Sequence, residues 1–81
     1  MEPYKEILMD LQSNVFRIML QYGPISDADL SNRIYGNQGF PALDITATLE
    51  EMDSGGFIER KGTCFQLTLK GVERASLILN E

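Results

Sequence analysis

The stretch SGGFIERKGTCFQLTLKG, residues 54–71, constrains the fold of this chain more than any other part of it. Its two β-rich runs, FIER and CFQLTL, are joined by KGT, which predicts a β-hairpin with Gly62 at its tip. The preceding SGG predicts the end of a helix, because glycine is the usual residue just past a helix C-terminus. A closing helix is expected to begin at about Lys70 or Gly71.

The N-terminal segment is predicted to be helical from Pro3 to Gly23, because its apolar residues fall at steps of three and four. Pro3 suits the first turn of such a helix. Ser13 and Asn14 both favour helix caps, so the same segment could also form two helices.

A second, shorter helix is expected to begin at Ser26 or Asp27 and to end near Gly36. Asp29 would lie in its first turn, where a carboxylate suits the helix dipole. The sequence YGNQGFP then predicts a connector, and Pro41 is expected to start a third helix.

The third helix is predicted to have one buried and one exposed face. Its buried face comprises Ala42, Ile45, Leu49 and Met52. Its outward-pointing residues are Leu43, Ala47, Glu50, Glu51 and Ser54. Together with the hairpin, these helices predict an α+β fold in which residues 1–81 form one domain.

Charge is distributed unevenly along the chain. The 7 basic and 12 acidic residues give a formal net charge of -5, which argues against binding of nucleic acid by general electrostatics alone. From residue 26 to residue 56, six acidic residues stand against Arg33 alone, whereas from residue 57 to residue 74 four basic residues stand against two acidic ones. A surface that faces phosphate groups is therefore expected in the second of these segments.

Several classes of function are not expected. The chain has no histidine and a single cysteine, Cys64, so the common nucleophile and base pairs of enzymes and the usual zinc sites cannot be assembled. Neither catalysis nor a metal or other cofactor is therefore predicted. No apolar run approaches the roughly 18 to 20 residues of a membrane span, and the N-terminus lacks a signal-peptide pattern, so a cytoplasmic location is expected.

The order helix, helix, glycine-bearing turn, helix and hairpin resembles the winged helix-turn-helix of bacterial and archaeal transcriptional regulators, including the MarR-like and PadR-like groups. In that family the strand after the third helix typically has glycine, two apolar residues, an acid and a base, matched here by Gly56, Phe57, Ile58, Glu59 and Arg60. The return strand and the start of the last helix are matched by Phe65, Leu67, Thr68, Lys70 and Gly71. The resemblance covers nearly the whole chain and implies a three-helix core, a two-stranded wing, and N- and C-terminal helical segments.

The resemblance further implies that the chain is a DNA-binding transcriptional regulator. Its third helix would enter the major groove of double-stranded DNA, and the hairpin wing would lie against the backbone or the minor groove. Base contacts are then expected from Leu43, Asp44, Thr46, Ala47 and Thr48. Phosphate contacts are expected from Arg33, Arg60, Lys61, Thr63 and Lys70.

A second interpretation follows from the charge of the third helix. DNA-binding members of the family usually have Arg, Lys, Asn or Gln on the exposed face of this helix, and none of these occurs between Ala42 and Ser54. In this respect the chain departs from the family's pattern. An acidic winged helix could instead bind a basic protein partner at Glu50 and Glu51 without binding DNA.

The two ends of the chain carry more apolar residues than a winged core needs, and surplus apolar surface on a small domain usually indicates association. The regulators that it resembles dimerise through terminal helices. A homodimer interface is therefore expected from Tyr4, Ile7, Leu8, Leu11, Val72, Ala75, Ile78 and Leu79. The alternative is that the first helix packs along its own domain.

Overall fold

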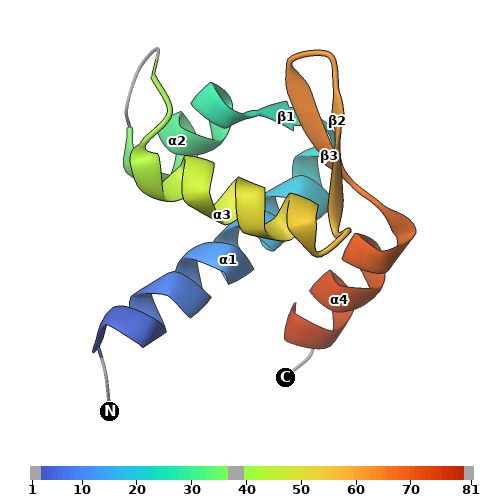
Figure 1. Cartoon of the computed structure of the whole chain (residues 1–81), viewed down its shortest axis with the longest axis horizontal. Coiled ribbons are helices and arrows are strands. Elements are labelled where there is room, and N and C mark those ends of the chain that lie inside the picture. The colour runs from blue at the N-terminus through green and yellow to red at the C-terminus, as the bar shows by residue number, and fades with distance from the viewer. Residues whose placement is uncertain (1–2, 37–39, 80–81) are drawn as a thin grey trace.

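The computed structural model describes residues 3–36 and 40–79, and the side chains of residues 11–36 and 40–78. The elements follow in the order α1 (Pro3–Tyr22), β1 (Ile25–Ser26), α2 (Asp27–Tyr35), α3 (Leu43–Ser54), β2 (Ile58–Lys61), β3 (Cys64–Leu67) and α4 (Leu69–Leu79), as Figure 1 shows. The three strands form one antiparallel sheet in the order β1-β3-β2. The predicted α+β class is therefore confirmed for the described residues.

The first helix is continuous, so the two-helix alternative at Ser13 and Asn14 does not hold. Val15 and Phe16 follow immediately and are completely buried, which keeps this part of α1 packed against the core. Among the described helices, none combines the length and the apolar character that crossing a membrane requires.

The first strand was not predicted from the sequence. It consists of two residues, Ile25 and Ser26, which pair with Phe65 and Cys64 of β3. Two residues are too few to show an alternating pattern. Ser26 also caps α2, because its side-chain oxygen accepts a hydrogen bond from the Asp29 N–H at 3.1 Å. The predicted start of the second helix is therefore confirmed.

The third helix begins slightly later than predicted. Pro41 lies outside it, and Ala42 is the capping residue, with an extended backbone at φ -70° and ψ 150°. The Ala42 N–H donates to the Ser31 hydroxyl oxygen of α2 at 2.9 Å. This hydrogen bond connects the start of α3 to α2 across the intervening connector.

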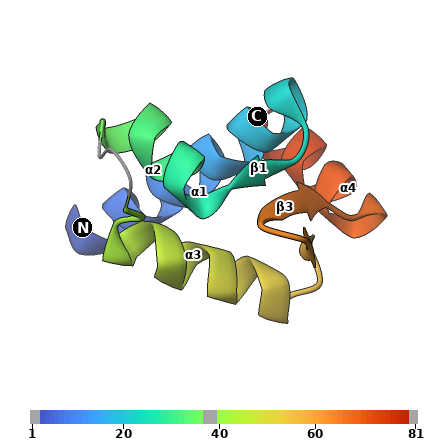
Figure 2. The same cartoon turned by 90° about the horizontal axis from the view of Figure 1, so that it is seen from above.

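One face of α1 lies in the core, and this helix contacts α2, α3, α4 and β3. Figure 2 shows the hairpin and α4 at one end of the molecule and the C-terminal end of α2 at the other. The buried apolar residues come from every described helix and strand, and they are Leu11, Val15, Phe16, Met19, Ile25, Leu30, Ile45, Leu49, Met52, Ile58, Phe65 and Ala75. Helices and sheet therefore share one hydrophobic core.

The described ends of the chain pack largely against their own domain. Leu11 of α1 and Ala75 of α4 are 5% and 0% exposed, so their assignment to a dimer interface is wrong, because side chains buried in their own core cannot reach a second copy. Ile78 is partly buried against the same core, whereas Val72 is 40% exposed. The remaining predicted interface side chains, which lie outside the described residues, are those of Tyr4, Ile7, Leu8 and Leu79.

Hydrogen bonds at the base of the hairpin attach it to α3 and α4. The Thr68 hydroxyl donates to the Gly56 carbonyl at 2.6 Å and accepts from the Gly71 N–H at 3.1 Å. The Thr68 N–H donates to the Phe57 carbonyl at 3.0 Å. Thr68 is thus the cap of α4, which begins at Leu69, slightly earlier than predicted.

Gly71 allows α4 to lie directly against the segment that enters β2. A Cβ atom at this position would come within 1.9 Å of the Phe57 carbonyl oxygen and within 3.1 Å of the Leu67 side chain. A backbone carbonyl cannot rotate away as a flexible side chain can. Any side chain at Gly71 therefore forces α4 and the hairpin apart.

Replacing Gly71 with alanine is expected to lower the free energy of unfolding by about 2 kcal/mol, in the range of overpacking effects. The better helix propensity of alanine, worth about 1 kcal/mol, opposes this loss but does not cancel it. Urea unfolding followed by circular dichroism measures the change. Ser76→Ala, at an exposed position of the same helix, is the control and should not destabilise the protein. Equal stability of the two variants would contradict the close packing at Gly71.

Candidate binding surface on α3 and the hairpin

The exposed face of α3 is acidic. Its buried residues are Ile45, Thr48, Leu49 and Met52. Leu43 is 86% exposed, and the exposed positions that follow it along the helix are Asp44, Ala47, Glu50, Glu51, Asp53 and Ser54. The side chains that α3 offers to a partner therefore include four carboxylates and no basic group.

Thr48 does not belong to this face. Its side chain is 5% exposed and lies on the same side of the helix as Ile45 and Met52, because residues three and four apart share a helix face. Its predicted contact with a DNA base is therefore wrong. Thr46 is half-buried, and its hydroxyl lies 3.4 Å from the Ala42 carbonyl oxygen. Of the predicted base-contacting residues, those that are fully exposed are Leu43, Asp44 and Ala47.

The two basic residues of the hairpin point to opposite faces of the sheet. Arg60 pairs with Phe65 in the strand register, whereas Lys61 pairs with Cys64. Because successive side chains of a strand alternate between faces, Arg60 lies on the side of Phe65 and Lys61 on the other side. The Arg60 guanidinium is 5.1 Å from the centre of the Phe65 ring, a cation–π contact across the strands. Arg60 and Lys61, both predicted to contact phosphate, therefore lie on different faces of the hairpin.

Lys70 has a structural role that the sequence did not reveal. Its Nζ donates to the Gly55 carbonyl oxygen at 2.7 Å and lies 5.0 Å from the centre of the Phe57 ring. Gly55 is the residue that follows α3, so the ammonium group stabilises the negative end of the helix dipole. Arg74, one turn further along α4, also lies over Phe57, at 5.4 Å.

Arg33 likewise rests on an aromatic ring, 4.0 Å from the centre of Tyr22 at the end of α1. Among the predicted phosphate contacts, Lys61 and Thr63 are the exposed residues next to the hairpin turn. The five residues predicted to contact phosphate are thus spread over the start of α4, the end of α2 and two faces of the hairpin. They are Arg33, Arg60, Lys61, Thr63 and Lys70. They do not form one continuous basic surface.

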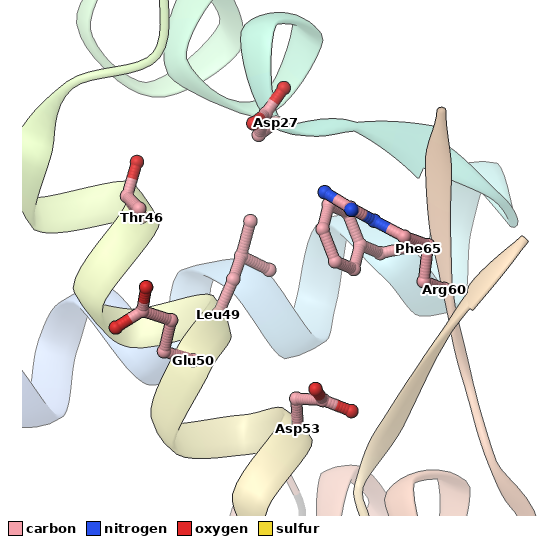
Figure 3. A pocket seen from close by; sticks show the side chains of 7 residues that line it. All are labelled: Asp27, Thr46, Leu49, Glu50, Asp53, Arg60 and Phe65. Carbon is pink, nitrogen blue, oxygen red and sulfur yellow. The ribbon is translucent and has the colours of Figure 1, made fainter. Parts of the chain in front are cut away.

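A groove of about 290 Å³ lies between α3 and the hairpin, and it was not predicted. It is lined by Asp27, Thr46, Leu49, Glu50, Asp53, Arg60 and Phe65, shown in Figure 3. Leu49 and Phe65 are almost fully buried and contribute the apolar part of the wall. Three carboxylates therefore share the groove with one guanidinium.

The groove residues come from three separate parts of the sequence, so local pattern could not bring them together. Asp27 is the first residue of α2, Glu50 and Asp53 belong to α3, and Arg60 to β2. In Figure 3 the carboxylates lie on different sides of the opening instead of meeting at one point. The only sequence signal was the excess of acidic residues between positions 26 and 56.

A shallower hollow adjoins the groove on the outer side of α3. It is lined by Ala47, Glu50, Glu51 and Ser54. Glu50 borders both concavities, so they form a continuous acidic surface along α3. We define the acidic surface as the groove and this hollow together.

Within the described part of the chain, no three histidine, cysteine, aspartate or glutamate residues are arranged to hold a metal ion. Comparisons of the chain with protein families, with curated proteins and with solved structures give no match.

Replacing Lys70 with methionine is expected to lower the free energy of unfolding by about 0.5–1 kcal/mol, because the carbonyl at the end of α3 loses a charged donor. Methionine keeps the apolar stem and removes only the ammonium group. Thermal or urea unfolding measures the change. Lys61→Met, on an exposed strand position, removes the same charge and should alter stability by less than about 0.5 kcal/mol. Equal losses would show that net charge, not the Gly55 contact, stabilises the fold.

Proposed function

We propose that this chain is a winged-helix interaction domain whose acidic surface binds a basic segment of a protein partner. The observation that carries the proposal is the charge of that surface. Four carboxylates, those of Asp27, Glu50, Glu51 and Asp53, line it together with a single guanidinium, that of Arg60.

The arrangement of elements supports the winged-helix part of the proposal. The chain places α3 next to a two-stranded hairpin and connects it to α2 through a glycine-containing segment. This order is compatible with the winged helix-turn-helix that the sequence resembles. In such domains the third helix and the hairpin flank the binding surface, and here the groove lies between them.

The electrostatics of this surface favour a cationic partner over a polyanion. A phosphate backbone is held mainly by Lys and Arg, and carboxylates placed against it repel it. The C-terminal end of α3 already holds a cation, since the Lys70 Nζ lies 2.7 Å from the Gly55 carbonyl oxygen, so the attraction for a partner comes from the carboxylates.

Charge reversal on α3 tests the proposal. The combined variant Glu50→Lys with Glu51→Lys is expected to weaken binding of a labelled peptide of alternating lysine and serine by about tenfold or more, because exposed pairs contribute up to about 1 kcal/mol each and reversal also introduces repulsion. Fluorescence anisotropy at low ionic strength measures the affinity. Wild-type binding should weaken as salt is raised, since screening shortens the Debye length to about 8 Å at physiological ionic strength.

The control is Glu59→Lys with Glu73→Lys, two exposed acidic residues on β2 and α4. This variant changes the net charge by the same amount but leaves the acidic surface intact. It is expected to retain most of the peptide affinity. Equal weakening in the two double variants would mean that only the net charge attracts the peptide, and no binding by wild type would contradict the proposed function altogether.

A second candidate function, binding of double-stranded DNA as a transcriptional regulator, is favoured by a different observation. Lys61 and Thr63 are exposed next to the turn of the hairpin, where a wing would meet the DNA backbone. A symmetric homodimer would double such weak contacts. On α4 the exposed apolar residues available for self-association are Leu69, Val72 and Leu77, and further exposed apolar residues, among them Leu20, Phe40 and Leu43, lie elsewhere on the described surface.

For this second function, Lys61→Gln is expected to weaken binding to random-sequence duplexes several-fold and to reduce the slope of log affinity against log salt by about one. Anisotropy titration of a labelled duplex at several salt concentrations measures both quantities, and light scattering records the mass of the protein in the same buffers. An unchanged salt slope would remove the hairpin turn from any DNA contact. Wild-type protein that does not bind duplex even at low salt would contradict DNA binding itself.

A further inference from the structure

If the proposed function holds, part of the basic partner must bind in the groove. We infer that the groove holds one lysine or arginine side chain of that partner, with Arg60 as the competing cation of the domain itself. The volume of about 290 Å³ is at the lower limit of small-molecule sites, which span roughly 300–1,000 Å³. That size suits one long side chain.

The composition of the groove matches the two parts of such a side chain. The aliphatic stem of lysine or arginine can lie along apolar surface while its charged head stays among polar groups. Leu49 and Phe65 provide the apolar wall. Figure 3 shows the carboxylates of Asp27, Glu50 and Asp53 around the opening, where the cationic head would lie.

The three carboxylates are not equivalent. One Asp27 carboxylate oxygen already accepts a hydrogen bond from the Ala28 N–H at 2.8 Å, and Asp27 stands at the positive end of α2. Glu50 and Asp53 belong to the C-terminal half of α3, away from the positive end of that helix, and both are exposed. Glu50 and Asp53 are therefore the main anchors of the head group.

The guanidinium of Arg60 is a positive charge that lies inside the groove before any partner binds. Its guanidinium is held over the Phe65 ring, 5.1 Å from the centre, and Figure 3 shows it directed into the opening. An incoming lysine or arginine side chain must share the carboxylates with this group and is repelled by it. Removing the charge of Arg60 should therefore strengthen binding of a basic partner, whereas it would weaken binding of DNA.

The acidic surface continues beyond the groove, which favours a protein segment as the source of the side chain. The outer hollow shares Glu50 with the groove and adds Glu51. A single free amine would use only the groove. A peptide with one side chain in the groove can place its next basic residue in the hollow.

The first test compares Arg60→Gln with Lys61→Gln, two variants with the same change in net charge and neighbouring positions on opposite faces of the hairpin. With the labelled lysine–serine peptide at low ionic strength, Arg60→Gln is expected to tighten binding about three- to fivefold, the effect of one exposed charge interaction. Lys61→Gln should change the affinity by less than twofold, an estimate for a charge off the binding face. Weaker binding by Arg60→Gln, or equal effects of both variants, would overturn the inference.

The second test compares Asp53→Asn with Glu51→Gln. Both remove one carboxylate from α3, but Asp53 lines the groove and Glu51 lines only the outer hollow. Asp53→Asn is expected to weaken peptide binding about fivefold, and Glu51→Gln about twofold or less. Both substitutions relieve a negative charge at the C-terminal end of a helix, so lower stability cannot explain a loss. Equal losses would overturn the inference.

Two further outcomes separate the inference from the proposed function. Peptide binding that is weakened by Glu50→Lys with Glu51→Lys, but is indifferent to Arg60 and Asp53, would keep the proposed function and overturn the anchor in the groove. Arginine amide that binds as tightly as the peptide would show that the groove takes a free amine, which also overturns the inference. Absence of any peptide binding would reject the proposed function and the inference together.

Discussion

The contact between Gly71 and the Phe57 carbonyl determines where the hairpin stands. The room for a side chain at residue 71 is taken by that carbonyl oxygen, which would lie 1.9 Å from a Cβ atom. Thr68 joins the same strand entry to the cap of α4 through hydrogen bonds to Gly56 and Phe57. Because the end of α3 leads directly into this junction, the angle between α3 and the hairpin is set here. The groove between them depends on that angle.

A second constraint is how the chain uses its basic residues. The cationic groups of Arg33, Arg60, Lys70 and Arg74 all lie over aromatic rings, and Lys70 also caps α3. These contacts bring basic groups to the ends of helices and to the sheet, away from the outer face of α3. The negative charge of the carboxylates on that face is consequently not neutralised by these basic groups. A partner that approaches α3 meets mostly negative charge.

Much of the fold could be predicted because glycine, proline and capping residues mark the ends of its elements. The hairpin around Gly62, the start of α2 at Ser26 and the end of α3 before Gly55 all follow from such local signals. Other features depend on tertiary contacts and could not be predicted. The strand β1 exists only through its pairing with Phe65 and Cys64.

The candidate site was harder to predict than the fold, since its properties arise from side-chain direction. Thr48 was expected to be exposed, but the core extends far enough around α3 to bury it. Adjacent positions in a strand separate Arg60 from Lys61, although they are neighbours in the sequence. The groove brings together Asp27, Asp53 and Phe65 from three elements.

Binding of a basic protein segment by α3 and the groove can be tested by nuclear magnetic resonance. ¹⁵N-labelled protein is titrated with the lysine–serine peptide, and the amide chemical shifts are recorded. The largest shifts are expected at Thr46, Glu50, Asp53 and Arg60, with little change at Thr63. Shifts confined to the turn of the hairpin, or none at all, would contradict binding at α3 and the groove.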